Sequence, residues 1–267
     1  MIDIIVTNYH TEDDLQRFLE SFARHGPKDG YSLTVIDVDV EPYERHIPPG
    51  RQAAFLGGRR FGVAGNIGYA RACNLGAALT NGDVVAFFNA DTFLIEDRSI
   101  EECAGALLAN ARWGVLGPRQ ISSAGKFTHA GIFGTHQAPR IRGWQEFATN
   151  TPQGPKYTNV EQAISVAGSV YFVKRECWDT LAECPVYRLV APDAEGAFLP
   201  TPHYYEETWC SYHAWHHGWM VMYYGRETFG HEWHKASPVG GKADTVHMKE
   251  SRRLFREACD HHGIPHD

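Results

Sequence analysis

Residues 66–76 read NIGYARACNLG, and residues 82–91 read GDVVAFFNAD. The first stretch is a loop rich in Asn and Gly that opens a short helix, and the second is a turn followed by an apolar run. That run ends at Asp91. Open α/β sheets present ligand-binding groups at the carboxyl ends of buried strands in this way. The two stretches therefore predict that Asp91 holds a cation against phosphate oxygens.

This pattern resembles the family 2 glycosyltransferases of the GT-A fold, which show N-x-G-[FY]-A-x-A-x-N-x-G, then G-D and an apolar strand, then a short acidic motif of the D-x-D type. The matching positions are Asn66, Gly68, Tyr69, Ala70, Ala72, Asn74, Gly76, Gly82 and Asp83. The acidic motif is degenerate, because residues 89–91 keep only its last Asp. The resemblance implies a Rossmann-like, mostly parallel α/β sheet flanked by helices, with a mixed acceptor-side half.

Length and composition fit one globular α/β domain, since the chain has 267 residues of which 43% are hydrophobic. No apolar run reaches the roughly 18 residues of a transmembrane helix, and residues 1–6 indicate a strand rather than a signal peptide. Six cysteines without C-x-x-C spacing favour reduced thiols and a cytoplasmic location. The net charge of −7 argues against a broad nucleic-acid surface.

The first part of the chain alternates strand and helix patterns, which predicts a parallel, doubly wound sheet. Thr11 is expected to start the first helix with Asp14 in a capping-box variant. Residues 41–58 are expected to be a loop. The predicted strands are 2–6, 33–38, 60–63 and 83–88, and the other predicted helices are 69–80 and 101–111.

Periodicity weakens after residue 113, and residues 114–160 are expected to be irregular or to form hairpins. Strands are predicted within 160–173 and over 219–224, and helices over 204–217 and 245–259. We expect a single GT-A domain. Its parts would be a nucleotide-sugar half (1–115), an acceptor-binding and catalytic half (116–240) and a helical tail (241–267).

The donor site is expected at the carboxyl ends of the first strands. The resemblance assigns nucleotide binding to Thr7, Asn8, Tyr9, Asp37, Asn66, Gly68, Arg71, Asn74 and Asn89. Asp37 aligns with the family's Asp that accepts hydrogen bonds from the base, although Val38 replaces the usual Asn. A strand-end carboxylate in a turn is the alternative for Asp37, and a plain β-to-α connection is the alternative for 7–9.

The metal site implied by the resemblance uses Asp91 and His231 to hold Mn²⁺ or Mg²⁺ against the diphosphate. Asn89 would contact the ribose or a metal-bound water. The alternatives are a helix N-cap for Asp91 and a structural role for His231, and His234 is a second candidate ligand. Residues 231–234 read HEWH and not H-E-x-x-H, so they do not predict a zinc protease. The paired histidines 216–217 and 261–262 are expected to be solvated.

The catalytic base is expected in YYEETWC, residues 204–210. Glu207 aligns with the general base of the resembled family, which is an Asp there, and Glu206 precedes it. An exposed acidic helix start is the alternative. Gly168, Ser169 and Trp209 are expected to line the acceptor side, with simple packing as the alternative for Gly168.

Together these features predict a metal-dependent glycosyltransferase that moves a sugar from a nucleotide-sugar donor to an acceptor hydroxyl, with inversion and with Glu207 as base. A UDP-sugar is the default donor by resemblance alone. Two alternatives remain: a nucleotidyltransferase, and a degenerate transferase that acts as a sugar- or nucleotide-binding module. The acceptor stays open between a glycan, a lipid, a protein, a small molecule and a modified nucleic-acid base.

Overall fold

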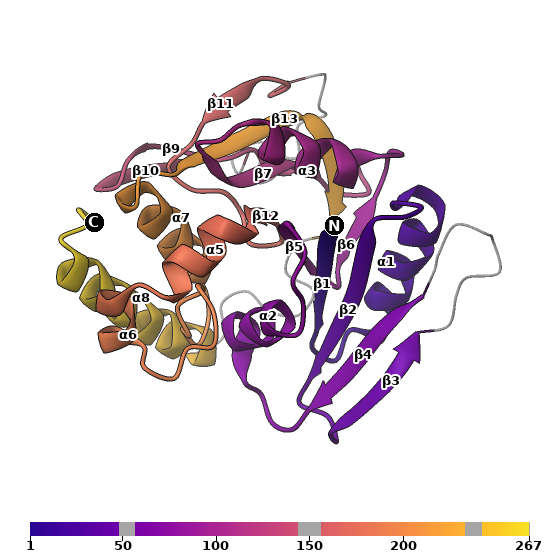
Figure 1. Cartoon of the computed structure of the whole chain (residues 1–267), viewed down its shortest axis with the longest axis horizontal. Coiled ribbons are helices and arrows are strands. Elements are labelled where there is room, and N and C mark those ends of the chain that lie inside the picture. Colours follow the sequence, from indigo (N-terminus) through magenta and orange to yellow (C-terminus); the bar gives the residue numbers. More distant parts are fainter. Residues whose placement is uncertain (48–56, 144–155, 233–241, 267) are drawn as a thin grey trace.

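The computed structural model describes residues 1–47, 57–143, 156–232 and 242–266, with only the backbone described for 242–245. These residues form an α/β fold around a large central sheet (Figure 1). Its main path runs β11-β13-β7-β12-β5-β1-β2-β4-β3. Among the described residues, every helix is too short or too polar to cross a lipid bilayer.

The N-terminal half of the sheet is parallel, as the alternating pattern predicts. β1 (Ile2–Asn8) pairs in parallel with β2 (Tyr31–Val38) and β5 (Val84–Asn89), and β2 pairs in parallel with β4 (Gly58–Val63). α1 (Glu12–His25) and α2 (Gly68–Ala78) connect these strands. The carboxyl ends of β1, β2 and β5 therefore meet at one edge, where a ligand site is expected.

The second half of the sheet is mixed. β12 (Val170–Lys174) runs antiparallel between β5 and β7 (Trp113–Ile121), and β7 pairs in parallel with β13 (Met220–His231). The smaller strands are β6 (Thr92–Leu94), β8 (Phe127–His129), β9 (Ile132–Thr135), β10 (Ala138–Ile141) and β11 (Val160–Gln162). The remaining helices are α3 (Ser99–Ala109), α5 (Arg175–Ala182), α6 (Pro185–Val190), α7 (Glu206–His216) and α8 (Lys242–His262).

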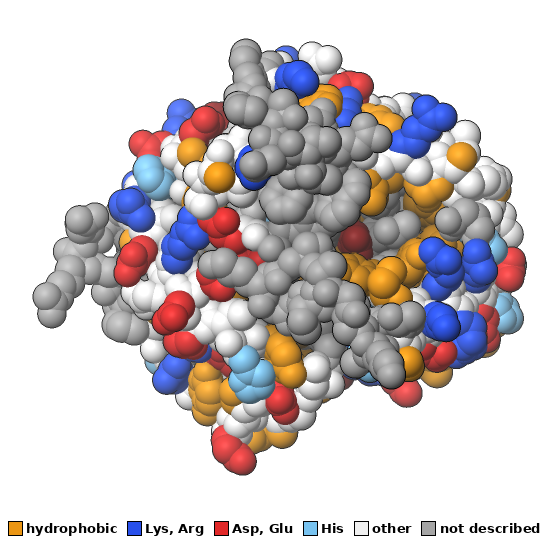
Figure 2. All heavy atoms as spheres, turned by 180° about the vertical axis from the view of Figure 1, so that it is seen from behind, with side chains coloured by type: hydrophobic (Ala, Val, Ile, Leu, Met, Phe, Trp, Pro, Cys, Tyr) orange, Lys and Arg blue, Asp and Glu red, His pale blue; other side chains and the backbone are white. Residues whose placement is uncertain are grey.

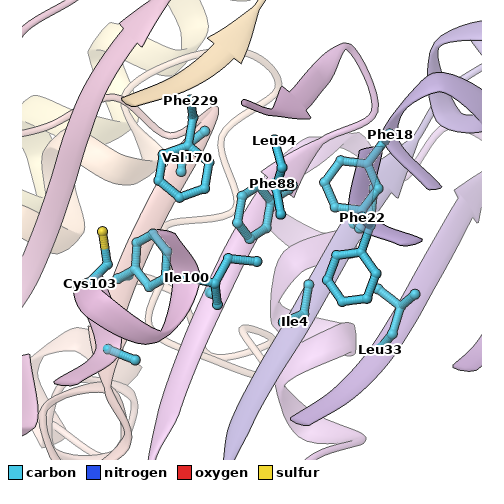
Figure 3. Packing of buried hydrophobic residues seen from close by; sticks show 14 of the residues in the cluster. Ile4, Phe18, Phe22, Leu33, Phe88, Leu94, Ile100, Cys103, Val170 and Phe229 are labelled. Carbon is cyan, nitrogen blue, oxygen red and sulfur yellow. The ribbon is translucent and has the colours of Figure 1, made fainter. Parts of the chain in front are cut away.

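The central strands are buried on both faces, so neighbouring residues enter different cores. Phe88 belongs to the cluster that contains Phe18 and Phe22 of α1 (Figure 3), whereas Phe87 faces the cluster that contains Trp178 of α5. A third cluster lies beneath α8 and includes Trp209 of α7. These cores fix the direction in which each strand end points.

β13 is longer than the predicted strand over 219–224, because an irregularity allows it to continue. Its pairing with β7 shifts register between Tyr224 and Thr228 and then resumes. Beyond the shift, β13 also pairs with β6, which places His231 opposite Thr92. A bulge of this kind re-aims a strand without ending it.

Other predicted elements need correction. Residues 41–58 include β3 (Tyr43–Ile47) and the start of β4, so the predicted loop is wrong there. Residues 114–160 contain the predicted hairpin pairs, β7 with β8 and β9 with β10. The length of β7 is not apparent from the sequence pattern, because this strand is buried almost throughout. Thr11 makes no side-chain cap, and the Oδ1 atom of Asn8 instead accepts hydrogen bonds from the Thr11 N–H (3.2 Å) and hydroxyl (2.8 Å).

Candidate active site

The structure brings together the two residues that are expected to bind a metal. Asp91 follows β5, His231 ends β13, and the Nε2 atom of His231 lies 3.6 Å from the Oδ1 atom of Asp91. The backbone holds this approach in place, because the N–H of Glu232 donates to the carbonyl of Asp91 at 3.1 Å. The side chains of Asp91 and His231 are 10% and 9% exposed. A carboxylate and an imidazole at the rim of a sheet suit Mn²⁺ or a similar cation.

Asn89 and His129 add polar atoms near this pair. The Oδ1 atom of Asn89 is buried and accepts no hydrogen bond from the described residues. Burial first, and then the charges of His231 and Arg142, lower the pKa of His129 to about 3, so its ring is neutral. Sequence reasoning missed His129, because it stands alone in a region of weak periodicity. An acceptor oxygen without a donor is a feature that a bound hydroxyl or water would satisfy.

Asp37 lies at the end of β2 in a closed hydrogen-bond network. One carboxylate oxygen accepts from Nδ2 of Asn8 (2.6 Å) and from Nη2 of Arg60 (2.7 Å). The other accepts from the Tyr43 hydroxyl and from Nε of Arg60. Burial alone would raise the pKa of Asp37, but the hydrogen bonds from Arg60, Tyr43 and Asn8 together lower it. Both oxygens are therefore already engaged within the chain.

The remaining residues of the expected donor site fall into two groups. Thr7, Tyr9, Asn66, Gly68 and Arg71 lie at strand ends or at the start of α2. The Oδ1 atom of Asn66 accepts from the Gly68 N–H at 3.0 Å, and Gly68 has a φ of 77°, which favours glycine. Asn74 is different, because its amide is fully used by the peptide groups of Phe198 (2.9 and 3.1 Å). The expected role of Asn74 as a nucleotide ligand therefore needs correction, because its side chain links α2 to the backbone at Phe198.

Glu206, which is buried, and Glu207, which is partly buried, form an acidic pair at the start of α7. Two residues in the left-handed region precede them, Tyr204 (φ 63°) and Tyr205 (φ 73°). This strained conformation is uncommon for non-glycine residues and clusters at functional sites. The hydroxyl of Thr201 donates to Oε2 of Glu206 at 3.2 Å, whereas Oε2 of Glu207 receives no hydrogen bond from the described residues.

Both glutamates have unusual proton affinities. Burial, and next the repulsion from Glu207, raise the pKa of Glu206 well above its ordinary value. Burial also raises the pKa of Glu207, although backbone N–H groups at the start of α7 oppose the change. Figure 2 shows a hollow on the face opposite the view of Figure 1, edged by hydrophobic side chains and containing an acidic side chain. Carboxyl groups in apolar surroundings are suited to proton transfer near neutral pH.

Gly168 and Ser169 connect the metal pair with the glutamates. The carbonyl of Ser169 accepts from the Asn89 N–H at 3.0 Å, two residues before Asp91. Gly168 packs against Glu207, since a Cβ atom at Gly168 would lie 3.3 Å from the Glu207 Cβ. The Tyr69 hydroxyl donates to the Gly168 carbonyl at 2.6 Å. The Asp91–His231 pair and the acidic pair therefore border one continuous segment.

The model of the glycosyl transferase family 2 matches residues 3–129. Residues 3–129 therefore match a family 2 glycosyltransferase domain. That match includes Asp91 and the expected donor residues but ends before Gly168, the glutamates and His231. A search of the curated proteins finds no match.

Solved structures resemble nearly the whole chain. The mannosyltransferase PcManGT from Pyrobaculum calidifontis, in complex with GDP-Man and Mn²⁺, gives a TM-score of 0.57 at 12% identity over 97% of this chain and 64% of its own. GalNAc-T7 with UDP, GalNAc and Mn²⁺ gives 0.60 at 14% identity over 97% and 48%. Residues 1–349 of S. aureus TarS with UDP-GlcNAc give 0.58 at 14% identity over 96% and 66%. These likenesses show the GT-A fold, and the chain spans about half to two thirds of those structures.

Outside the part that matches the family model, the expected acceptor role of Trp209 needs correction. Trp209 is fully buried in the third core cluster, and its ring stacks on Tyr187 with centroids 5.6 Å apart. It replaces a polar residue of the usual motif because this position faces the core under α8 rather than a cleft. Ser169 is also committed, since its hydroxyl donates to Oε1 of Gln120 at 2.6 Å. His234 lies outside the described residues.

Proposed function

We propose that the protein transfers a sugar from a nucleotide-sugar donor, by default a UDP-sugar, to an acceptor hydroxyl with inversion at the anomeric carbon. The observation that carries the proposal is the continuous site in which Asp91 and His231 connect through Gly168 and Ser169 to Glu207. Sugar transfer requires a group that stabilises the diphosphate leaving group beside a group that activates the acceptor hydroxyl. The family match and the nucleotide-sugar complexes of similar folds support this assignment.

Asp91 and His231 are the residues that would hold the divalent cation, Mn²⁺ or Mg²⁺. When bound, the cation neutralises charge on the departing diphosphate. Asn89 would contribute its free Oδ1 acceptor to a ribose hydroxyl or to a cation-bound water. Asp37 would act on the donor through Asn8, whose amide it fixes, because its own oxygens are occupied.

Glu207 would take the proton from the acceptor hydroxyl, with Glu206 as its modulator. Two neighbouring buried carboxyl groups do not both ionise easily, so they share one proton. Glu206 is the more deeply buried of the two, so it keeps that proton. Glu207 is then left as the carboxylate, and the N-terminus of α7 stabilises its charge. Glu207 would then serve as the base in place of the family's Asp, although its side chain is one methylene longer.

A reducing, cytoplasmic location agrees with the state of the cysteines. All six are free thiols in the described part of the chain, and all are buried. Disulfides are frequent in oxidising compartments and rare in the cytosol.

The test is calorimetric binding of UDP and GDP to the Asp91→Asn variant with and without Mn²⁺. The wild-type chain should bind the preferred nucleotide only with the metal, and Asp91→Asn should weaken that binding by roughly 100-fold or more, since loss of even supporting groups costs about 10–100-fold. Asp97→Asn is the matched control, because Asp97 is exposed and its carboxylate pairs with His25 at 2.8 Å. Equal nucleotide binding by Asp91→Asn and wild type would reduce Asp91 to a turn residue.

The same samples should release nucleoside diphosphate slowly from UDP-sugars when Mn²⁺ is present. Chelation should abolish that release. A chain that binds the nucleotide sugar but never releases diphosphate, alone or with acceptors, would instead be a binding module.

A further inference from the structure

A second group of metal-ligating side chains lies in the third core cluster, away from Asp91. Cys184 precedes α6, His213 lies on α7 and His262 ends α8, and these helices lie side by side in Figure 1. One ligand atom of each residue lies within 4.8 Å of those of the other two. All three are buried, with exposed fractions of 7%, 0% and 8%. The expectation that His262 is solvated is therefore wrong.

The contact between Cys184 and His262 has the spacing of two zinc ligands. The Sγ atom of Cys184 lies 3.7 Å from Nε2 of His262. Tetrahedral Zn²⁺ with ordinary bond lengths separates a sulfur and a nitrogen ligand by about 3.6 Å. The other ring nitrogen of His262, Nδ1, donates to the Ala258 carbonyl over 2.8 Å. Because Nδ1 donates this hydrogen bond, the lone pair of the ring is on Nε2, which faces the sulfur of Cys184. Metal-bound histidines usually donate from their other ring nitrogen in the same way.

His213 supplies the third nitrogen. Its Nδ1 atom is buried and has no hydrogen-bond partner among the described residues. Its Nε2 atom lies 3.1 Å from Nε2 of His217, one helical turn further along α7. An unpaired buried polar atom costs stability unless something binds it.

Simple packing explains this group less well. His213 does stack near Trp209, with centroids 4.7 Å apart, and a buried thiol behaves as a small hydrophobic group. Packing alone, however, gives no reason for three ligand atoms to converge or for a buried imidazole nitrogen to lack a partner. A bound metal would supply the missing partner of the His213 nitrogen and would also engage Cys184 and His262, which otherwise contact each other.

We propose that Cys184, His213 and His262 bind one Zn²⁺ ion, with the fourth position filled by water. The thiol of Cys184 releases its proton to solvent as the Zn–S bond forms, and no redox change occurs. Thiolate and imidazole ligands suit zinc, whereas the carboxylate of Asp91 suits Mn²⁺ or Mg²⁺. The ion would fasten α8 and α6 to α7, the helix that begins with Glu206 and Glu207.

Cobalt titration tests the proposal directly. Full-length protein, stripped with a chelator and freed of it, should bind about one Co²⁺ per chain with a thiolate-to-cobalt charge-transfer band, and Zn²⁺ should displace it. Cys184→Ser should lose that band. Cys259→Ser is the matched control, because Cys259 is a fully buried cysteine of the same cluster that lies outside the three-residue group. Asp91→Asn should keep the band, which separates this site from the donor metal.

Thermal melts provide the second measurement. A strong chelator should lower the melting temperature of wild type and of Cys259→Ser by several degrees and leave Cys184→Ser unchanged. The absence of a thiolate–cobalt band in folded wild type would overturn the proposal, whether or not the variants fold. A band that persists in Cys184→Ser would overturn it equally.

Discussion

Two buried carboxylate sites of this chain are in opposite electrostatic states. Asp37, at the end of a strand, accepts hydrogen bonds from Asn8, Tyr43 and Arg60, and its pKa is lowered. Glu206 and Glu207, at the start of a helix, face each other with few donors, and their pKa values are raised. Similar burial therefore gives opposite results, because the number of donors decides whether the charged form is favoured. A satisfied carboxylate organises a site, whereas an unsatisfied one is available for chemistry.

The largest expected effect follows from removing the available carboxylate. Glu207→Gln keeps size and hydrogen bonding but accepts no proton, so the transfer rate should fall by about 10²–10⁴-fold. Donor binding should stay near normal. Because the pKa of Glu207 is raised above 4.5, wild-type activity should fall when the pH drops below that raised pKa. Steady-state rates measured against pH should show this acidic decline in wild type but not in the variant.

Glu206→Gln is the matched comparison and should lose less activity. An inactive Glu206→Gln beside an active Glu207→Gln would exchange their roles. If both variants were active, the catalytic base would lie elsewhere, and the two glutamates would not be a site for proton transfer.

The next effect comes from the satisfied carboxylate. Asp37→Asn leaves Arg60 with only Glu12, so the free energy of unfolding measured with urea should fall by about 3 kcal/mol. Asp39→Asn, at an exposed pair with His10, should change it by less than about 1 kcal/mol. A second change, Arg60→Met, should recover part of the loss, since it removes the unpaired buried charge. Unchanged stability together with weaker UDP binding would show instead that Asp37 reads the base.

A smaller effect is expected from crowding Glu207. The Cβ atom of Gly168→Ala would lie 3.3–3.5 Å from three side-chain carbons of Glu207, so the carboxylate must shift by a few tenths of an ångström. A loss of about tenfold in turnover is expected, because misplacement of about 1 Å costs roughly 100-fold. Gly105→Ala is the control, since its Cβ would meet nothing within 4 Å. Wild-type turnover in Gly168→Ala would mean that Glu207 does not need its present position.

The smallest effect concerns stability against pH. Glu206 has a higher pKa in the folded chain than in the unfolded chain, where it is near 4.5. Such a carboxyl group stabilises the fold below its unfolded-state pKa, and this contribution is lost as pH rises through its folded-state pKa. Asp37, with a lowered pKa, contributes stability above about 3.8 that is lost on acidification. Glu206→Gln should therefore become progressively more stable than wild type as pH rises above 4.5, by urea unfolding at several pH values. A constant difference would show that Glu206 has an ordinary pKa.

The donor half could be predicted from sequence, because its signals are local. Alternating strands and helices fixed the parallel order, and the apolar run before Asp91 located a strand end. The approach of His231 to Asp91 followed from the family resemblance, since no local pattern links β13 with β5. The strands and helices of the N-terminal half could therefore be predicted with little tertiary information.

The missed features depend on tertiary contacts. The network around Asp37 includes Tyr43 from a strand within an expected loop, and Arg60 from the strand beside it. Trp209 and His262 carry polar atoms, yet the packing of α8 against α6 and α7 buries both. Asn74 matches the family motif by sequence but spends its amide on Phe198. Residue type does not reveal burial when the covering element lies far along the chain.

The irregularity in β13 between Tyr224 and Thr228 has a consequence for how this chain can vary. Side chains alternate between the faces of a strand, so one inserted or deleted residue after the irregularity would turn His231 to the opposite face. The irregular segment itself already departs from regular pairing, so it can absorb a change in length there more easily. Insertions and deletions in related chains should therefore gather at 225–227 and be absent from 228–231.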